Sequence, residues 1–517
     1  MYRGSSARKQ RKQRIMDERV GEMSGSLDSL SLTDSLEENV TLMEQLFVDV
    51  DTVLVRRINN QNDSALKFAL VYSEGMVDRD AISEFIVRPL SISGAIKPGA
   101  DLIASLIGQV LDADEADETS SVKTIVEAIS YGDTVLLAEG AAQAVVMNTK
   151  CFKTRAVAEP ESERSLTGPR EGFNECMMIN LSLIRRKVRT NELKIKLREF
   201  GRRTKTQACI CYMDGLVNKA ILKELERRLD SVDIDGVLDT QYLAEIIRDS
   251  RMSLFRTTGN TERPDVVIGK LLEGRIAVLV DGSPVALTVP YLFIENFQSG
   301  EDYYFSFYFT SFSRLLRILG FFLTVLVPGL YVAIVAFHHE ILPTQLLVNV
   351  ATERTSVPLP AALEAFLMLI VFDLLRETGA RMPGNIGQAL SIVGALVIGQ
   401  AAVEAKMVAA PMIIVVALTG ITSLLVPKLN APIIYIRMLL LLVSTMFGFY
   451  GLVLGASAVV IHVINMRTFG IPVLTLTGNL NKQETRDTWV RDPWWMLKLR
   501  PRMAADRTRM KNGGGQS

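Results

Sequence analysis

The residues with the clearest chemical potential lie on one face of an apolar segment that runs from Ile386 to Ala405. The segment is about 20 residues long, which is enough for one crossing of a bilayer. Residues spaced three or four apart share a helical face, and this face carries Val393, Val397, Gln400 and Glu404. Polar groups at membrane depth face protein or water rather than lipid. The face therefore predicts the lining of an ion pore. Two valines form a constriction that gates by dewetting, Gln400 supplies neutral ligands, and Glu404 attracts cations at a mouth.

The opposite face of the same segment is made of small residues, namely Gly387, Ser391, Ala395 and Ala402. Small residues let helices approach closely in lipid, so we expect this face to pack against neighbouring helices. One face for neighbours and one for water is typical of a pore-lining helix in an oligomer. The alternative is an ordinary buried helix of a membrane bundle, and spacing alone favours that alternative.

Glu364 is a second acidic candidate, near the start of the apolar segment 361–375. It fits a cation-attracting mouth or, equally well, a membrane interface near a helix start. His338, His339 and His462 are the only histidines, and none has a metal-type or triad-type neighbourhood in the sequence. We therefore expect no enzyme, no catalytic residue, no cofactor and no metal site.

Composition separates the chain into two parts. Residues 1–300 are charged and soluble in character, whereas about 315–465 are mostly apolar. The formal net charge of zero indicates no preference for nucleic acid. The four cysteines, Cys151, Cys176, Cys209 and Cys211, all lie in the charged part, which favours a reducing, cytoplasmic setting. We expect Cys209 and Cys211 on opposite faces of a strand. The N-terminus lacks an apolar signal core, so we expect this part not to be exported.

An internal repeat organises the charged part. The stretch 71–78 (VYSEGMVD) is echoed by 211–218 (CYMDGLVN), and 132–140 (GDTVLLAEG) is echoed by 274–282 (GRIAVLVDG). Both echoes keep an offset of about 140 residues, which indicates duplication of one folding unit. The predicted fold class is α+β: a duplicated α/β cytoplasmic domain followed by an α-helical transmembrane domain of about five apolar segments.

The predicted domain limits follow from these patterns. An acidic stretch, 111–121, is expected to be a loop, and the basic stretch 185–205 is expected to be a helix facing another subunit or lipid rather than nucleic acid. The limits are 1–35, a disordered basic and Ser-rich tail; 36–158, the first α/β subdomain; 159–189, a linker that contains GPREGF; 190–298, the second α/β subdomain; 299–314, an aromatic interfacial segment; 315–466, the transmembrane domain; and 467–517, a basic cytoplasmic tail.

The apolar segments raise a question of parity. Positive charge flanks the block on both sides, so both ends prefer the cytoplasm, and an odd number of crossings cannot satisfy this. Either the short segment 361–375 does not cross, or the long last segment, 433–465, bends back. The last segment carries Gly448, Gly451 and Gly455, which predict a helix-packing face.

Several stretches together resemble the A subunit of the GerA-type spore germinant receptor family. They run in family order over nearly the whole chain beyond residue 36. They include 168–173 (GPREGF), Leu183-Ile184-Arg185-Arg186, Thr261 to Asp265, Leu279 to Pro284 (LVDGSP), Glu301 to Tyr304 (EDYY) and Leu375 to Ala402. The chain differs from the family pattern at Ser253-Leu254-Phe255-Arg256, where the family commonly has Ser-Pro-Phe-Pro.

This resemblance implies an integral protein of the inner membrane of bacterial spores, with its N-terminal domain in the cytoplasm. It implies a B-type transporter-like subunit and a C-type lipoprotein as partners. It also implies assembly into a homo-oligomeric, pentameric cation channel that opens when nutrient is sensed. Two alternatives stay open: a stage V A-locus-type paralogue, which is a spore channel that amplifies germination, or a component of a secondary transporter.

Overall fold

The chain forms two compact units. The computed structural model describes residues 27–94, 102–111, 116–151, 163, 165–382, 386–474, 487–497 and 500. Unit 1 comprises the described residues within Met1–Arg248, Thr258–Pro290 and Lys498–Ser517, and unit 2 comprises those within Asp249–Thr257 and Tyr291–Leu497.

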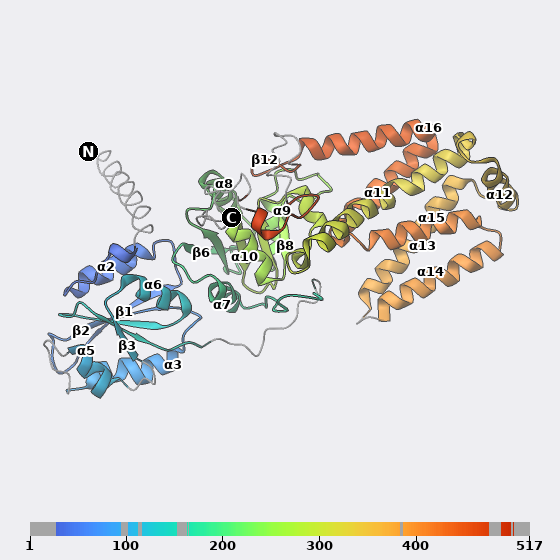
Figure 1. Ribbon diagram of the computed structural model, residues 1–517. Coiled ribbons are helices and arrows are strands. Elements are labelled where there is room, and N and C mark those ends of the chain that lie inside the picture. Colours follow the sequence, from blue (N-terminus) through green and yellow to red (C-terminus); the bar gives the residue numbers. More distant parts are fainter. Residues whose placement is uncertain are drawn as a thin grey trace. The chain divides into compact units, whose positions relative to one another are not determined.

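Unit 1 is built on two antiparallel five-stranded sheets with the same strand order (Figure 1). The first sheet has the order β1-β2-β4-β5-β3 and the second β6-β7-β9-β10-β8. The shared order agrees with the repeat in the sequence. The strands are β1 (Val53–Asn59), β2 (Lys67–Ser73), β3 (Ala116–Thr119), β4 (Thr134–Ala138), β5 (Ala144–Met147), β6 (Leu193–Phe200), β7 (Thr206–Met213), β8 (Gly259–Thr261), β9 (Ile276–Val280) and β10 (Ala286–Val289).

Helices cover both faces of the first sheet, because alternate residues of each buried strand point to opposite faces. On β2, Ala69 and Val71 belong to the core that contains α2 and α6, whereas Phe68 and Leu70 belong to the core on the other face. The helices are α2 (Leu36–Leu46) and α6 (Val122–Tyr131) on one face, and α3 (Arg79–Ala81), η2 (Ile82–Val87), α4 (Arg88–Ile92), α5 (Leu102–Ser105) and η3 (Leu106–Val110) on the other.

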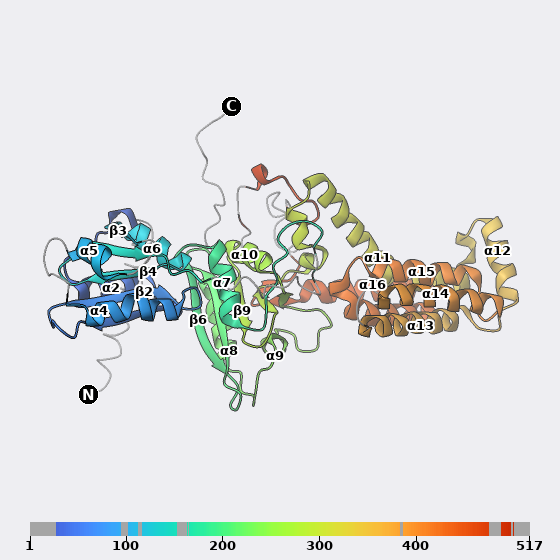
Figure 2. The same cartoon turned by 90° about the horizontal axis from the view of Figure 1, so that it is seen from below.

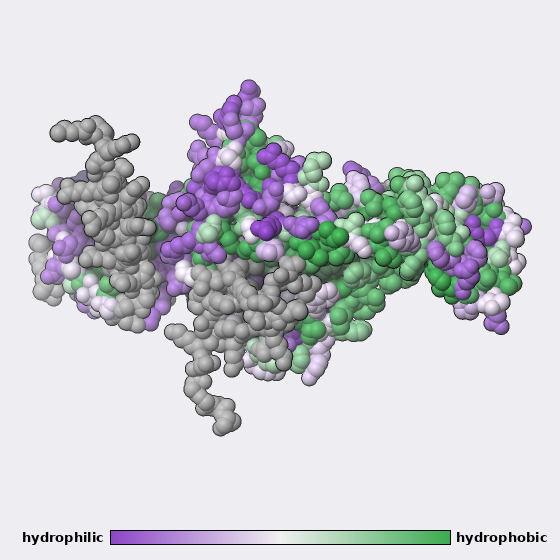
Figure 3. Space-filling view, turned by 90° about the horizontal axis from the view of Figure 1, so that it is seen from above, coloured by the Kyte–Doolittle hydropathy of each residue, from purple (hydrophilic) through white to green (hydrophobic). Residues whose placement is uncertain are grey.

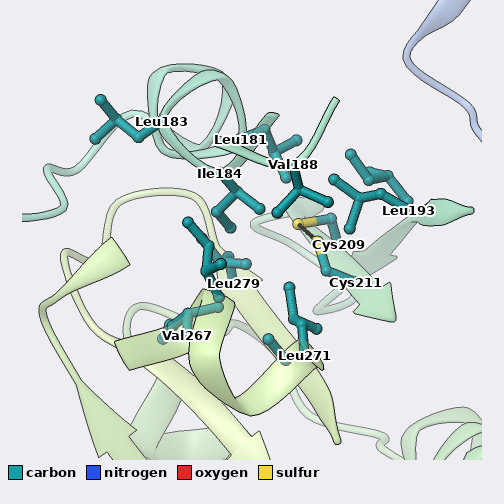
Figure 4. Close-up of a cluster of buried hydrophobic side chains, with 14 of the residues drawn as sticks. Leu181, Leu183, Ile184, Val188, Leu193, Cys209, Cys211, Val267, Leu271 and Leu279 are labelled. Carbon is teal, nitrogen blue, oxygen red and sulfur yellow. Dashed lines mark hydrogen bonds between the residues drawn. The ribbon is translucent and has the colours of Figure 1, made fainter. Parts of the chain in front are cut away.

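The second sheet packs one face against α7 (Met177–Lys187) and α10 (Pro264–Leu272). Figure 4 shows this core, with Ile184 and Leu271 directed toward the strands. Cys209 and Cys211 lie on the same face of β7, with their Sγ atoms 3.8 Å apart. The expectation of opposite faces was wrong, because residues two apart on a strand share a face. Two further helices belong to the part of unit 1 that contains the second sheet: α8 (Lys219–Asp230) and α9 (Thr240–Ile246).

Two glycines in the repeated sequence stretches, Gly75 and Gly215, have the same structural role. Gly75 and Gly215 follow β2 and β7 with φ values of 80° and 79°, in the left-handed region that glycine adopts without strain. Each turn leads to a side chain that caps the next helix: Asp78 accepts from the amides of residues 80 and 81, and Asn218 from that of residue 220.

Some elements of unit 1 fall outside their predicted limits. The acidic loop contains β3. The basic stretch expected to be a helix contains the end of α7, up to Lys187, but forms strand β6 from Leu193 to Phe200. The predicted linker contains α7, whose apolar face belongs to the second core. In the predicted tail, Leu32 is buried, whereas residues 1–26 lie outside the described part of the chain.

Unit 2 is a helical bundle in which α11, α13, α14, α15 and α16 run side by side (Figures 1 and 2). Its helices are η4 (Phe293–Phe297), η5 (Gly300–Tyr303), α11 (Phe307–Phe337), η6 (His339–Ile341), α12 (Thr344–Thr355), α13 (Ala361–Arg381), α14 (Ile386–Glu404), α15 (Ala410–Ser423), η7 (Pro427–Leu429), α16 (Asn430–Asn465) and η9 (Trp494–Met496). A short pair of strands follows α16, formed by β11 (Arg467–Thr468) and β12 (Ile471–Pro472).

The long helix α16 reverses direction at Gly448. This residue has φ 62° and ψ −142°, which is not helical and is accessible essentially only to glycine. A side-chain carbon placed on Gly455 would lie 2.6 Å from Leu440, 15 residues earlier. In a straight helix the two would be about 22 Å apart. The second half of α16 therefore returns along the first.

With this reversal the last of the five expected apolar segments forms two helical passes, so the described part of the bundle contains six. The passes are α11, α13, α14, α15 and the two halves of α16. Helix α13 runs to Arg381, beyond the predicted end at 375. Among the residues that the structure describes, two helical stretches are long and apolar enough to cross a membrane, Phe307–Phe337 and Pro427–Asn465, and the second includes both halves of α16.

Both ends of the bundle differ from the predicted limits. Helix α11 begins at Phe307, inside the segment expected to be interfacial. The predicted C-terminal tail is partly folded, because Asp487 and Arg491 bond to the start of α11. Residues 475–486 and 501–517 lie outside the described part of the chain.

Candidate functional site

Helix α14 presents its predicted functional face to the exterior of the single chain. Val393 and Val397 are exposed, the latter by 58% of its surface. Gln400 and Glu404 are also exposed, and the Gln400 Nε2 donates to Glu404 Oε1 over 3.4 Å. Two apolar and two polar side chains thus follow each other along one open face.

The other side of α14 packs closely within unit 2. A side-chain carbon on Gly394 would touch Leu375 of α13 at 3.4 Å, and one on Gly399 would touch Ile413 of α15 at the same distance. Ala402 packs against the core that contains Met412. Small residues therefore permit close contact between α14 and two neighbouring helices.

The remaining predicted packing residues differ in their surroundings. Ala395 is half-buried, and the side-chain surroundings of Gly387 and Ser391 lie outside what the structure describes. Gly451 is buried, and an added carbon would lie 2.5 Å from the carbonyl of Val443. Gly448 and Gly455 serve the reversal of α16 described above, which is a larger role than the packing face predicted for them.

Glu364 lies away from the open face of α14. Its side chain is fully buried, and Oε2 is 3.5 Å from Nη1 of Arg354 on α12. Ala365, the next residue, packs with Val332 of α11. The Glu364 carboxylate therefore faces protein rather than an open surface where it could attract cations.

A charged cluster at the centre of unit 2 was missed by sequence reasoning. Asp373 of α13 accepts from Arg437 of α16 over 2.6 Å and lies 3.3 Å from Arg376. Arg376 also donates to Ser423 of α15 over 3.4 Å. The Arg437 side chain is fully buried. The cluster thus joins three helices, and a signal was present in the sequence: a lone arginine in an apolar segment requires a partner.

The structure also brings Ser253 to His462, with Oγ 3.0 Å from Nε2. Ser253 Oγ further accepts from the amide of Phe255 and contacts the sulfur of Met466. Within the described ranges, no carboxylate bonds to His462, so a nucleophilic triad is not assembled. The contact fixes the segment 249–257 to the end of α16.

Within unit 1, buried polar contacts join the two sheets. Val50 pairs with Ile195 at the edge of β6, and Arg185 of α7 donates to Thr52 Oγ1 over 2.9 Å. Burial of the Arg185 guanidinium lowers its pKa to about 10, although Cys211 acts in the opposite direction. Lys196 lies 3.2 Å from Asp49 across the same junction. These contacts cover the free edge of β6, which would otherwise be open to unwanted pairing.

Comparisons with known proteins agree on one family. A model of the Bacillus/Clostridium GerA spore germination protein matches residues 41–503. Spore germination protein KA of Bacillus subtilis is 36% identical over 487 residues, which are 94% of this chain and 89% of that protein. The uncharacterized membrane protein YfkQ of Bacillus subtilis is 36% identical over 473 residues, 91% of each chain.

One solved structure is also similar. The crystal structure of the N-terminal domain of the A subunit of the Bacillus megaterium spore germinant receptor GerK3 is 29% identical to this chain. It covers 51% of this chain and 98% of its own, with a TM-score of 0.38.

Proposed function

Because the chain belongs to the Bacillus/Clostridium GerA spore germination protein family, we propose that it is the A-type subunit of a germinant receptor in the inner membrane of spores. Unit 2 crosses the membrane and unit 1 lies in the cytoplasm. A B-type transporter-like subunit and a C-type lipoprotein are its partners, as the family resemblance implies. Six passes support this arrangement, because an even number keeps both flanks of the bundle on one side.

In this proposal several copies, five by the same resemblance, surround an aqueous path lined by α14. One observation carries the idea: α14 packs Gly394, Gly399 and Ala402 against its neighbours and leaves Val397, Gln400 and Glu404 on an open face. Lipid would cover valine at no cost, but it would not solvate an amide one turn further along and a carboxylate two turns further along. Water and neighbouring copies fit the whole face better than lipid does.

Gating follows from the order of residues on this face. A ring of Val393 and Val397 side chains repels water from a narrow path and closes it without a physical plug. Glu404 lies about 10 Å further along the helix axis, where a ring of carboxylates concentrates cations. Nutrient sensed by the partner subunit widens the ring, the constriction fills with water, and monovalent cations flow.

Replacing Val397 with Ala tests this function. The smaller, less apolar ring should stay hydrated, so proteoliposomes with the variant complex should leak potassium several-fold faster without nutrient. Leu442→Ala is the matched control, because Leu442 is exposed to a similar extent, 64%, on α16. An unchanged basal leak in Val397→Ala, or an equal rise in both variants, contradicts the gate.

A further inference from the structure

The C-terminal residues 487–497, here called the strap, are bound to the beginning of α11. Tyr303 Oη donates to Asp487 Oδ2 over 2.8 Å, and Arg314 Nη1 lies 3.0 Å from Asp487 Oδ1. The amide of Arg491 donates to Ser311 Oγ over 3.1 Å. All of these residues belong to unit 2. The strap is therefore part of the folded bundle rather than a solvated tail.

Charged groups of the strap and of α11 are turned inward, toward each other. Arg314 is fully buried and pairs with Asp302 Oδ2 over 2.8 Å, and Arg317 lies 2.9 Å from Asp302 Oδ1. Arg491 is also buried and donates to the carbonyls of Asp302 and Phe305, at 2.8 and 2.9 Å. Ionic groups that satisfy each other in this way can be held in surroundings of low polarity.

Apolar side chains are turned outward from the same place. A stripe on α11 recurs at spacings of four and three, so it occupies one helical face: Tyr308, Phe312, Leu315, Leu319 and Phe322, all exposed. Tyr308 is 76% exposed. The stripe passes without a polar interruption into the apolar part of α11. Figure 3 shows hydrophobic residues gathered over the helices of unit 2.

The strap adds two tryptophans at the start of this stripe. The Trp495 ring lies 6.0 Å from Phe307 and the Trp494 ring 5.8 Å from Tyr303, measured between ring centroids. Both tryptophans remain exposed, Trp495 by 67%. Their amphipathic rings prefer the boundary where a bilayer meets water.

We propose that the strap and the first turns of α11 form one membrane-interface anchor, in which Trp494, Trp495 and Tyr308 occupy the headgroup layer of the bilayer. Continuity with the apolar stripe favours lipid over a protein partner as the occupant. The inward charges explain how an anchor with three arginines, Arg314, Arg317 and Arg491, enters this layer. The inference rests on the proposed membrane position of unit 2 but not on ion conduction.

The chain itself supplies the probe, because its three tryptophans, Trp489, Trp494 and Trp495, all lie in the strap. The full-length protein is placed in phosphatidylcholine nanodiscs, and intrinsic tryptophan emission is compared among unbrominated lipid, lipid brominated near the headgroup and lipid brominated near the chain end. Placement in the headgroup layer should let the shallow bromines roughly halve the emission, with less quenching by the deep ones. The anchor is overturned if acrylamide in the aqueous phase quenches the emission and neither brominated lipid does. It is also overturned if no quencher reaches the tryptophans, because protein then covers them.

Two variants test the role of the charge cluster. Arg491→Ala removes the donor to the carbonyls of Asp302 and Phe305, so the strap should detach, with emission lost to acrylamide and no longer to shallow bromines. Arg467→Ala makes the same charge change at an exposed position after α16 and should behave like the wild type. If the two variants show the same quenching, Arg491 does not hold the strap in the headgroup layer and the proposal is contradicted. If Arg491→Ala misfolds, the quenching of the wild-type protein by shallow and deep bromines still tests the anchor. Failure of channel flux leaves these results unaffected.

Discussion

The exteriors of the two units differ in a way that identifies their surroundings. Large apolar side chains exposed on unit 1, such as Phe85 and Leu238, occur singly, as they do on most proteins in water. On unit 2 they form stripes at helical spacing, such as Leu439, Leu442 and Met446 on α16. A continuous exposed apolar surface of this kind marks contact with lipid or protein. This difference is what the proposal requires, with unit 1 in water and unit 2 in lipid.

The fully buried arginine side chains of the two units also differ in their partners, although unit 1 pairs other buried arginines with carboxylates, such as Arg263 with Asp265 over 2.7 Å. The fully buried arginine of unit 1, Arg185, hydrogen-bonds a hydroxyl at its junction between sheets. The fully buried arginines of unit 2, Arg314 and Arg437, each face an aspartate. Inside a bilayer no water solvates an unpaired charge, so a buried arginine there needs a carboxylate partner.

The largest expected effect comes from breaking such a pair. Asp373→Ala leaves buried Arg437 and half-buried Arg376 without their shared counter-charge, which should lower the free energy of unfolding by about 3–5 kcal/mol. Denaturant titration of the detergent-solubilised chain measures the change. The control is Glu377→Ala, which removes the exposed pair with Arg381 and should cost less than about 1 kcal/mol. Equal losses in the two variants mean that the interior of unit 2 holds its charges no differently from a surface.

A matched pair of substitutions tests the exteriors. Leu238 in unit 1 and Leu442 in unit 2 are exposed by 66% and 64%. Leu442→Lys should disfavour membrane insertion by about 2.5–3.5 kcal/mol, whereas Leu238→Lys should change stability by less than about 0.5 kcal/mol. Yield in the membrane fraction and unfolding in lipid give the two values. If Leu442→Lys inserts into the membrane as well as the wild type does, the exteriors of the two units do not differ in the way described.

The smallest effect concerns Glu171 of unit 1, which pairs with Arg186 and Lys187. Burial raises the pKa of Glu171, but the two cations outweigh burial, so its pKa lies below the ordinary value. The pair therefore stabilises the fold above that ordinary value and loses its contribution, at most about 1 kcal/mol, as pH falls through the folded-state pKa. Hydrogen exchange around residues 165–175, corrected for intrinsic rates, should rise in acid, and Glu171→Gln should abolish that rise. A rise that survives in the variant assigns the acid sensitivity to another group.

Local patterns predicted much of this fold because glycine carries geometric information. The paired echoes around Gly75 and Gly215 predicted two copies of one topology, since only a few residues tolerate a positive φ. Contacts between residues far apart in the sequence could not be predicted from these patterns. Nothing near Arg437 in the sequence points to Asp373, 64 residues earlier, and Ser253 meets His462 across 209 residues.

Glycine in an apolar helix was the most instructive ambiguity. Gly448, Gly451 and Gly455 have the spacing of a packing face, and that pattern does not distinguish packing from a reversal of the chain. The structure separates them by φ: Gly448 alone of the three has a positive value. The parity of charges on the two flanks was the better signal, because it required the last segment to bend back or the short one not to cross.

The most direct test of the proposed aqueous path is the accessibility of α14 to water in the assembled complex. Val397 and Leu442 are exposed to similar extents in the single chain, but the proposal places the first at water and the second in lipid. Each is replaced by cysteine, alongside half-buried Ala395→Cys, in a chain whose exposed Cys176 and half-buried Cys151 are changed to serine. A cationic, membrane-impermeant methanethiosulfonate should modify Val397→Cys during nutrient activation and reduce potassium flux, and should leave the other two unmodified. Modification of none of the three, or of Leu442→Cys as readily as Val397→Cys, contradicts a shared aqueous path along α14.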